Sequence, residues 1–117
     1  MKVMALIYGD ESRWDALSEA DREEVYERYR AFGQSADGKV LDGAELAPTR
    51  SATTVRVRDG ETIVTDGPYA ETKEQLGGFY LLDVADLDEA IKWAHKCPGA
   101  RYGTIELRPI MEFPGAP

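Results

Sequence analysis

Two short stretches of the chain, residues 2–8 and 79–84, are apolar at nearly every position. Side chains on a β-strand alternate between its two faces, so both faces of each stretch would be apolar. Strands of this kind are covered on both sides, and we predict that these two lie at the centre of a sheet. In the first stretch one face would carry Val3, Ala5 and Ile7, and the other Met4, Leu6 and Tyr8.

Two other segments have the apolar spacing of helices. Ser18, followed three residues later by Asp21, resembles a capping box and predicts a helix over residues 18–35. Asp86 and Glu89 repeat this pattern before a second helix. The expected apolar positions are Val25, Tyr29 and Phe32 in the first helix and Leu87, Ala90, Ile91 and Ala94 in the second, which Pro98 and Gly99 end.

A hairpin is predicted between the two central strands. Residues 52–58 and 61–66 are rich in β-branched side chains, and Asp59-Gly60 joins them. A two-residue Asp-Gly link between alternating strands is a strong hairpin signal. The other expected segments are a polar loop at 9–15, a weak strand at 39–46, a polar connector at 70–76, a last strand at 104–110 and a patternless tail at 113–117.

This order of elements predicts a single α+β domain over residues 1–117, of the ferredoxin-like split βαβ kind with an inserted hairpin. Two helices cover only one face of such a sheet. The central strands are apolar on both faces, so the second face needs another cover. In a chain of 117 residues we expect that cover to be a second copy of the same sheet, which makes the protein a homodimer.

The composition of the chain limits the kinds of partner that we expect it to bind. Apolar residues make up 43% of the chain and charged residues 31%, as in a globular protein. The net charge of −8 argues against binding to nucleic acid or to an anionic membrane. Much of the acid lies in residues 19–27, which we interpret as the solvated face of a helix. The apolar run near the N-terminus is too short for a membrane span or a signal peptide.

Metal and cofactor sites are not expected. Cys97 is the only cysteine, so no internal disulfide can form, and a reduced, cytoplasmic protein is predicted. With His95 as the only histidine, no ligand-spaced pair exists for a metal, and we expect no cofactor. Gly77-Gly78 precedes a strand rather than a helix, unlike a phosphate-binding loop. Cys97 itself is expected to pack as a small buried side chain.

The densest run of unusual residues is Asp-Gly-Pro-Tyr-Ala-Glu-Thr-Lys-Glu-Gln-Leu-Gly-Gly-Phe at positions 66–79. It closely resembles the signature of the YCII-related family, in its DGPF-domain branch. Tyr69 stands where that signature has Phe, a change that keeps the ring and adds a hydroxyl. The similarity extends over nearly the whole chain, through the Trp93-Ala94 helix to the last strand.

The resemblance implies a dimeric α/β barrel in which two ferredoxin-like sheets face each other across a cleft. A related dehydrochlorinase acts on a chlorinated aromatic compound, and some relatives carry a His–Asp pair in the cleft. Other DGPF proteins are encoded beside, or fused to, extracytoplasmic-function sigma factors. This chain departs from the His–Asp pattern, because its one histidine, His95, falls at the edge of the second helix's apolar stripe.

Asp66 is the candidate catalytic residue. It follows a predicted strand and begins a rigid Gly-Pro turn, where burial could raise its pKa and make it a general base. The alternative is an Asp that only forms the turn. The candidate ligand-binding residues are Tyr8, Glu71, Lys73 and Arg108, with Arg50 and Glu106 nearby, and their alternatives are core packing, solvated ion pairs and an interface salt bridge.

Three hypotheses for the function therefore remain. The first is a small-molecule enzyme or binder that uses a cleft at the dimer-facing sheet, with Asp66 as its polar centre. The second is a regulatory or protein-interaction module linked to an extracytoplasmic-function sigma factor, with the acidic helix as the contact. The third is that the signature serves only folding and dimer formation.

Overall fold

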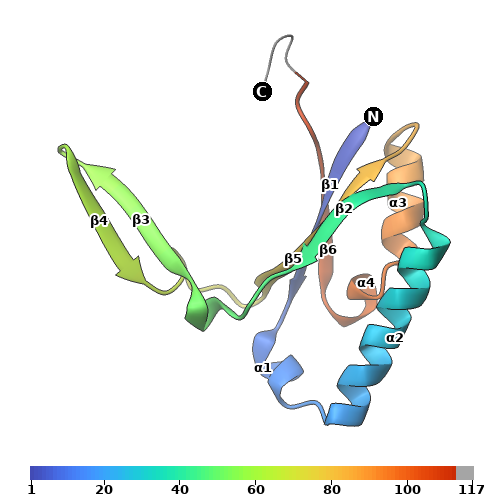
Figure 1. Cartoon of the computed structure of the whole chain (residues 1–117), viewed down its shortest axis with the longest axis horizontal. Helices are drawn as coiled ribbons and strands as arrows, with labels where there is room; N and C mark the ends of the chain where they lie inside the picture. The colour runs from blue at the N-terminus through green and yellow to red at the C-terminus, as the bar shows by residue number, and fades with distance from the viewer. Residues whose placement is uncertain (113–117) are drawn as a thin grey trace.

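The computed structural model describes residues 1–112 and has a four-stranded antiparallel sheet at its centre (Figure 1). The strand order is β2-β5-β1-β6, so the two stretches predicted to be central are central. This is the order expected of a ferredoxin-like fold, with the inserted strands left out of the count. The strands are β1 (Lys2–Gly9), β2 (Val40–Glu45), β5 (Gln75–Asp83) and β6 (Thr104–Pro109).

The two longer helices pack on one face of this sheet (Figure 1). Both predicted caps are present: the Ser18 side chain accepts a hydrogen bond from the Asp21 backbone N–H, and Asp86 accepts one from Glu89. These bonds satisfy N–H groups that have no partner within the helix. The helices are α1 (Glu11–Asp15), α2 (Glu19–Ser35), α3 (Leu87–Lys96) and α4 (Gly99–Tyr102).

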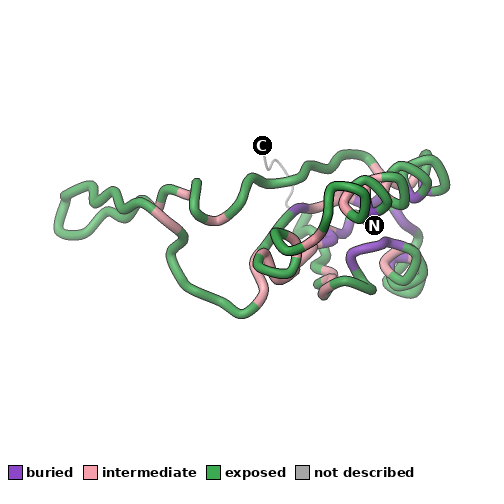
Figure 2. Tube along the Cα trace, turned by 90° about the horizontal axis from the view of Figure 1, so that it is seen from below, coloured by how far each residue is buried: buried purple, intermediate pink, exposed green. Residues whose placement is uncertain are grey.

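The predicted hairpin is confirmed. β3 (Thr53–Arg58) and β4 (Glu61–Asp66) pair as a separate two-stranded sheet, preceded by the short helix η1 (Thr49–Ser51). Both turn residues, Asp59 and Gly60, have positive φ angles of 51° and 77°, as a type I′ turn requires. Figures 1 and 2 show the hairpin standing away from the rest of the molecule. All residues of its strands except Thr54 are exposed.

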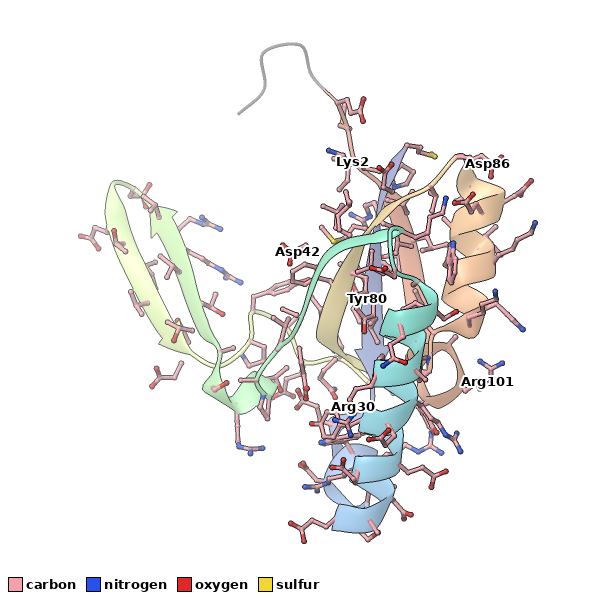
Figure 3. All side chains as sticks on the ribbon, turned by 45° about the vertical axis from the view of Figure 1, so that its right-hand side comes forward. Lys2, Arg30, Asp42, Tyr80, Asp86 and Arg101 are labelled. Carbon is pink, nitrogen blue, oxygen red and sulfur yellow. The ribbon has the colours of Figure 1, made fainter. Side chains whose placement is uncertain are left out.

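The core lies between the sheet and the helices, where Figure 2 shows the buried residues. Two clusters of buried side chains form it, one around Val3 and Leu82 and one around Phe32. The Phe32 ring centre is 5.4 Å from that of Tyr80, which lies between β5 and α2 (Figure 3). The buried members are Val3, Ala5, Leu82, Val84 and Ala90 in the first cluster and Phe32, Ala36 and Cys97 in the second.

The opposite face of the sheet carries a second apolar surface. The pairing register places Met4 against Leu81 and Leu6 against Phe79, with their side chains on the face away from the helices. All four side chains are partly exposed. We refer to Met4, Leu6, Phe79 and Leu81 as the open face. The second apolar face, inferred above from alternation alone, is therefore present in the structure.

Some local expectations were wrong. Residues 9–15 do not form a loop throughout, because Asp10 caps the short helix α1. β5 begins at Gln75, inside the predicted connector, where its extension pairs with β1 past a bulge. α4 was not predicted. The apolar stripe of α3 is only partly buried: Ala90 is fully covered, whereas Leu87 and Ile91 are about half exposed, since Trp93 fills the contact with Phe32 instead.

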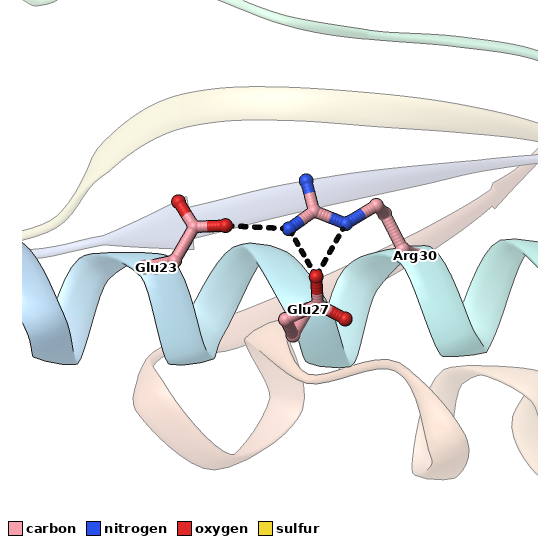
Figure 4. Close-up of polar contacts among 3 residues, drawn as sticks. All are labelled: Glu23, Glu27 and Arg30. Carbon is pink, nitrogen blue, oxygen red and sulfur yellow. Dashed lines mark hydrogen bonds and ion pairs between the residues drawn. The ribbon is translucent and has the colours of Figure 1, made fainter.

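The acidic stretch of α2 is on the surface, as predicted, and carries its own cations. Arg30 lies between two carboxylates, with its guanidinium 2.6 Å from Glu23 and also bonded to Glu27 (Figure 4). Arg28 pairs with Glu24 in the same way at 2.6 Å. Exposed pairs of this kind add little stability, but they reduce the negative charge on this surface.

The predicted tail at 113–117 lies outside the described residues. Within residues 1–112, no helix is both long enough and apolar enough to span a membrane.

Candidate functional site

A cavity of about 640 Å³ lies at the end of the sheet where β1 finishes and β5 starts. Its walls come from α1, the middle of α2, α4 and the ends of β1, β2 and β5. This volume is within the usual range for small-molecule sites. We call it the aromatic cavity, because seven of the chain's eleven aromatic residues line it: Tyr8, Trp14, Tyr26, Tyr29, Phe79, Tyr80 and Tyr102.

The deepest polar group of the cavity is the hydroxyl of Tyr29. Burial, together with the neighbouring Cys97 thiol, raises the pKa of Tyr29 above its usual value. Burial likewise raises the pKa of Cys97, which is 2% exposed. Both groups are therefore protonated at neutral pH. Tyr29 can donate a hydrogen bond to a ligand but is unsuited to accept a proton as a base.

Gly99 makes room for this arrangement. A Cβ atom at Gly99 would lie 2.7 Å from Cγ2 of Ile7 and 2.8 Å from the Tyr29 hydroxyl. Only a residue without a side chain lets α4 approach β1 and α2 so closely. The predicted helix stop at Pro98-Gly99 thus has a second role, since it also forms part of the cavity wall.

A second polar group stands nearer the mouth of the cavity. The Tyr26 hydroxyl donates to Oε1 of Glu45 at 3.1 Å, which joins α2 to β2. Trp14 of α1 packs edge-on against the Tyr26 ring, with ring centres 5.5 Å apart. Arg22 holds Trp14 in place, because its Nε donates to the Trp14 carbonyl and its guanidinium lies over the indole. This cluster combines aromatic surface with one carboxylate acceptor.

The rim next to the hairpin is held by Glu11. Its carboxylate accepts from the backbone N–H and from the hydroxyl of Thr49, both at 2.8 Å. The Glu11 backbone N–H in turn donates to the side chain of Gln75 at 2.9 Å. Through these bonds the base of the hairpin, α1 and the start of β5 form one connected wall.

Two cationic side chains, Arg13 and Arg101, also border the cavity. Arg101, on the outer side of α4 in Figure 3, donates to the His95 carbonyl at 2.8 Å. Its neighbour Tyr102 accepts a hydrogen bond from Arg28 at 2.6 Å. Guanidinium groups beside an aromatic pocket suit a ligand with an anionic oxygen.

The predicted site residues are not brought together. Tyr8 lines the aromatic cavity. Asp66 is the exposed last residue of β4, opposite Thr53 in the hairpin. Glu71 and Lys73 are exposed in the loop between β4 and β5. Arg108 lies on the open-face side of β6, where it forms an ion pair with Glu106 at 3.2 Å.

The other chemical candidates lie outside the cavity. His95 is exposed on α3, and Arg50 is exposed in η1. Cys97 is buried, as expected for a lone cysteine. Among residues 1–112, His, Cys, Asp and Glu side chains form no group of three or more that could hold a metal.

Sequence reasoning missed most of the cavity. Tyr26, Glu45 and Arg101 are far apart in the sequence, and no short motif connects them. Tyr29 was assigned to the core, and its ring does pack against the cluster around Phe32, while the residue also lines the cavity. One available signal was the number of aromatic residues early in the chain, since Tyr8, Trp14, Tyr26 and Tyr29 all line the cavity.

The sequence pattern of the YCII-related domain matches residues 1–114. An uncharacterized protein of Rhizobium meliloti is 45% identical over 117 residues, covering 97% of this chain and 94% of that protein. The solved structure of 5-chloro-2-hydroxyhydroquinone dehydrochlorinase from Burkholderia phenoliruptrix, in complex with 2,5-dihydroxybenzoquinone, is similar with a TM-score of 0.57. The match covers 97% of this chain and 96% of the dehydrochlorinase chain. The two sequences are 12% identical, so the similarity bears on the fold alone.

Proposed function

This chain belongs to the YCII-related domain family, and on that premise we propose that it binds a small hydroxylated ring compound in the aromatic cavity, as an enzyme or as a binding protein. The single observation behind the proposal is the cavity itself. It has the volume of a ligand site, and one of the seven aromatic residues that line it, Tyr29, supplies a buried hydroxyl donor. The quinone bound by the dehydrochlorinase of similar fold suggests this ligand class.

The expected contacts follow from the chemistry of the wall. A flat ring would stack against Tyr26 and Tyr80, since offset and edge-on contacts between rings are favourable. Tyr29 would donate a hydrogen bond to an oxygen of the ring. Glu45 would accept from a ring hydroxyl near the mouth, and Arg101 would attract a phenolate oxygen.

The test is a binding titration with 2,5-dihydroxybenzoquinone and with hydroquinone, in which calorimetry and tryptophan fluorescence measure the affinity. We expect Tyr29→Phe to bind about three- to tenfold more weakly, because one hydrogen bond is lost while the ring stays. Tyr69→Phe is the matched control, as it removes the hydroxyl of a residue that is 80% exposed and outside the cavity. No binding of either compound at millimolar concentration, or an equal loss in both variants, would contradict the proposal.

We also propose that the protein is a homodimer of the α/β barrel type, in the DGPF branch of the family, and that it works in the cytoplasm. The branch rests on residues 66–79, with Tyr69 as its one departure. The dimer rests on the open face, where four apolar side chains remain partly exposed. In that dimer Asp66, Glu71, Lys73 and Arg108 are the candidates for polar contacts, and Asp66→Asn should keep the fold.

The regulatory alternative is tested separately. If α2 binds a basic partner such as a sigma factor, charge reversal at residues 19–27 should abolish that contact in a pull-down, and Asp66→Asn should not. The intrahelical pairs of Arg28 and Arg30 lower the charge available for such a contact. The cavity hypothesis is therefore the one we favour.

A further inference from the structure

The hairpin β3–β4 has one apolar face that nothing in residues 1–112 covers. Its register pairs Val55 with Val64 and Val57 with Thr62, so these side chains share a face. The three valines are 60–62% exposed. Asp66, paired with Thr53, lies on the same face at the base of the hairpin. We call Val55, Val57 and Val64 the valine face.

An exposed hairpin of this length is not expected to be stable on its own. Each strand has six residues, about 20 Å of length, and the two strands pair with each other rather than with the main sheet. Valine has high strand propensity chiefly where its side chain packs against a neighbour. The valine face therefore calls for a surface to pack on.

The hairpin projects on the side of the sheet opposite to α2 and α3, which is the side of the open face (Figure 1). A molecule that covers the open face approaches from this side and so meets the hairpin. The hairpin also makes the chain extended, because its radius of gyration is 16.4 Å. A compact chain of this length would have about 13.4 Å.

The area of the open face suggests that the hairpin also takes part in a contact between two copies of the chain. Four strands of about six residues present a flat footprint of about 400 Å². A stable pair of proteins buries about 800 Å² on each partner. The sheet face by itself is therefore a small contact, and the hairpins supply further apolar surface in the same chain.

From these observations we infer that β3–β4 is an exchange arm, which packs its valine face against a second copy of this chain while the two open faces meet. The contact is reciprocal, since a two-fold axis makes each copy both give and receive an arm. Asp66, on the valine face, is then carried into the interface. This inference rests on the proposed homodimer and not on the proposed ligand.

The first experiment shortens the arm. Thr54 and Thr65 are register partners, so an Asn-Gly turn can replace residues 55–64 and leave the base of the hairpin intact. We expect sedimentation equilibrium to show a dimer for the wild type and a dimer weakened at least 100-fold for the shortened chain. Circular dichroism should show the same helix content in both.

Point variants guard against a folding artefact. Val64→Lys should weaken the dimer about 100-fold, because each buried valine accounts for about a factor of ten in Kd and the symmetry doubles the change. Thr65→Lys, on the next residue and the opposite face, is the matched control and should change the Kd less than threefold.

Two results would overturn the inference, and they differ. A dimer whose Kd is the same in the wild type, the shortened chain and Val64→Lys would exclude the arm but keep the dimer. A wild type that is still monomeric at about 50–100 μM, on the order of 10⁻⁴ M, would exclude both the arm and the dimer. Neither result bears on quinone binding, which is measured separately.

Discussion

At Gly99 the backbone of α4 comes so close to β1 and α2 that a side chain would collide with both. The atoms concerned are Cγ2 of Ile7 and the Tyr29 hydroxyl, at 2.7 and 2.8 Å from a Cβ. The same hydroxyl is the deepest polar group of the aromatic cavity. Packing and ligand binding thus meet at one position, where a single methyl group should disturb both.

We expect Gly99→Ala to lower the free energy of unfolding by about 1–3 kcal/mol, the usual effect of overpacking. It should also push Tyr29 out of its position and weaken ligand binding. Gly33→Ala is the control, since Gly33 lies in α2 with nothing within 4 Å of its Cβ position. That variant should be more stable by about 0.5–1 kcal/mol. Urea denaturation measures both, and equal effects in the two variants would contradict the packing argument.

Protonation of the buried groups predicts a loss of stability at high pH. Burial raises the pKa of Tyr29 above its ordinary value of 10.0 and that of Cys97 above 9.0. Between the unfolded and folded pKa values, the folded state holds more protons than the unfolded state. The free energy of unfolding should therefore be constant below about pH 9 with respect to these groups and fall as pH rises further.

The variant Tyr29→Phe separates the tyrosine from the thiol. It should make the decline above pH 10 shallower and leave the part that begins near pH 9 in place. Urea denaturation at several pH values from 8 to 11 gives the slopes. A wild-type and a Tyr29→Phe curve that run parallel over the whole range would refute the assignment.

At the scale of elements, the caps identified in the sequence hold the helices at the sheet. Asp86 accepts from the Glu89 backbone N–H at 2.9 Å, and Glu89 also pairs with Lys39 at 2.8 Å. The first bond fixes the start of α3, and the second ties α3 to the segment before β2. Because Ala90 of α3 is fully buried, the start of this helix sets how it packs on the sheet.

We expect Asp86→Ala to cost about 1 kcal/mol of stability, the typical effect of removing an N-cap. Asp88→Ala removes an exposed carboxylate from the same first turn without a capping bond, and should cost only a few tenths of a kcal/mol. Thermal or urea denaturation of the two variants checks the difference. Similar losses would mean that charge rather than the cap matters here.

At the scale of the whole molecule, a single chain is more extended than a compact protein of its length. Packing of the hairpin on a partner in a dimer would remove this extension. Its radius of gyration is 16.4 Å, and the hairpin accounts for the excess over a compact chain (Figure 2). Two compact chains together would have about 17–18 Å. Folding the arms onto the partner should therefore double the mass with little change in size.

Small-angle scattering tests this directly. We expect twice the monomer mass from the forward scattering, with a radius of gyration of about 17–18 Å. Extended arms on a dimer would instead give a value above about 20 Å. A single-chain mass with 16.4 Å would mean that the isolated chain is the form in solution.

Much of the architecture followed from local chemistry. Ser18, Asp86 and the Asp59-Gly60 turn each act through bonds or backbone angles within a few residues, and all three predictions were confirmed. Alternation likewise placed β1 and β5 at the centre of the sheet. α1 was missed, because Asp10 and a single helical turn leave too short an apolar pattern to recognise.

The sequence by itself determined the order of the elements, their caps and the presence of two apolar sheet faces, because these depend on neighbours along the chain. Only the tertiary structure decided where the cavity lies. Tyr29 and Gly99 are 70 positions apart, and they meet because α2 and α4 pack at the same end of the sheet. The structure also separated Asp66 from Tyr8, since an inserted hairpin directs its own strand ends and not those of the main sheet.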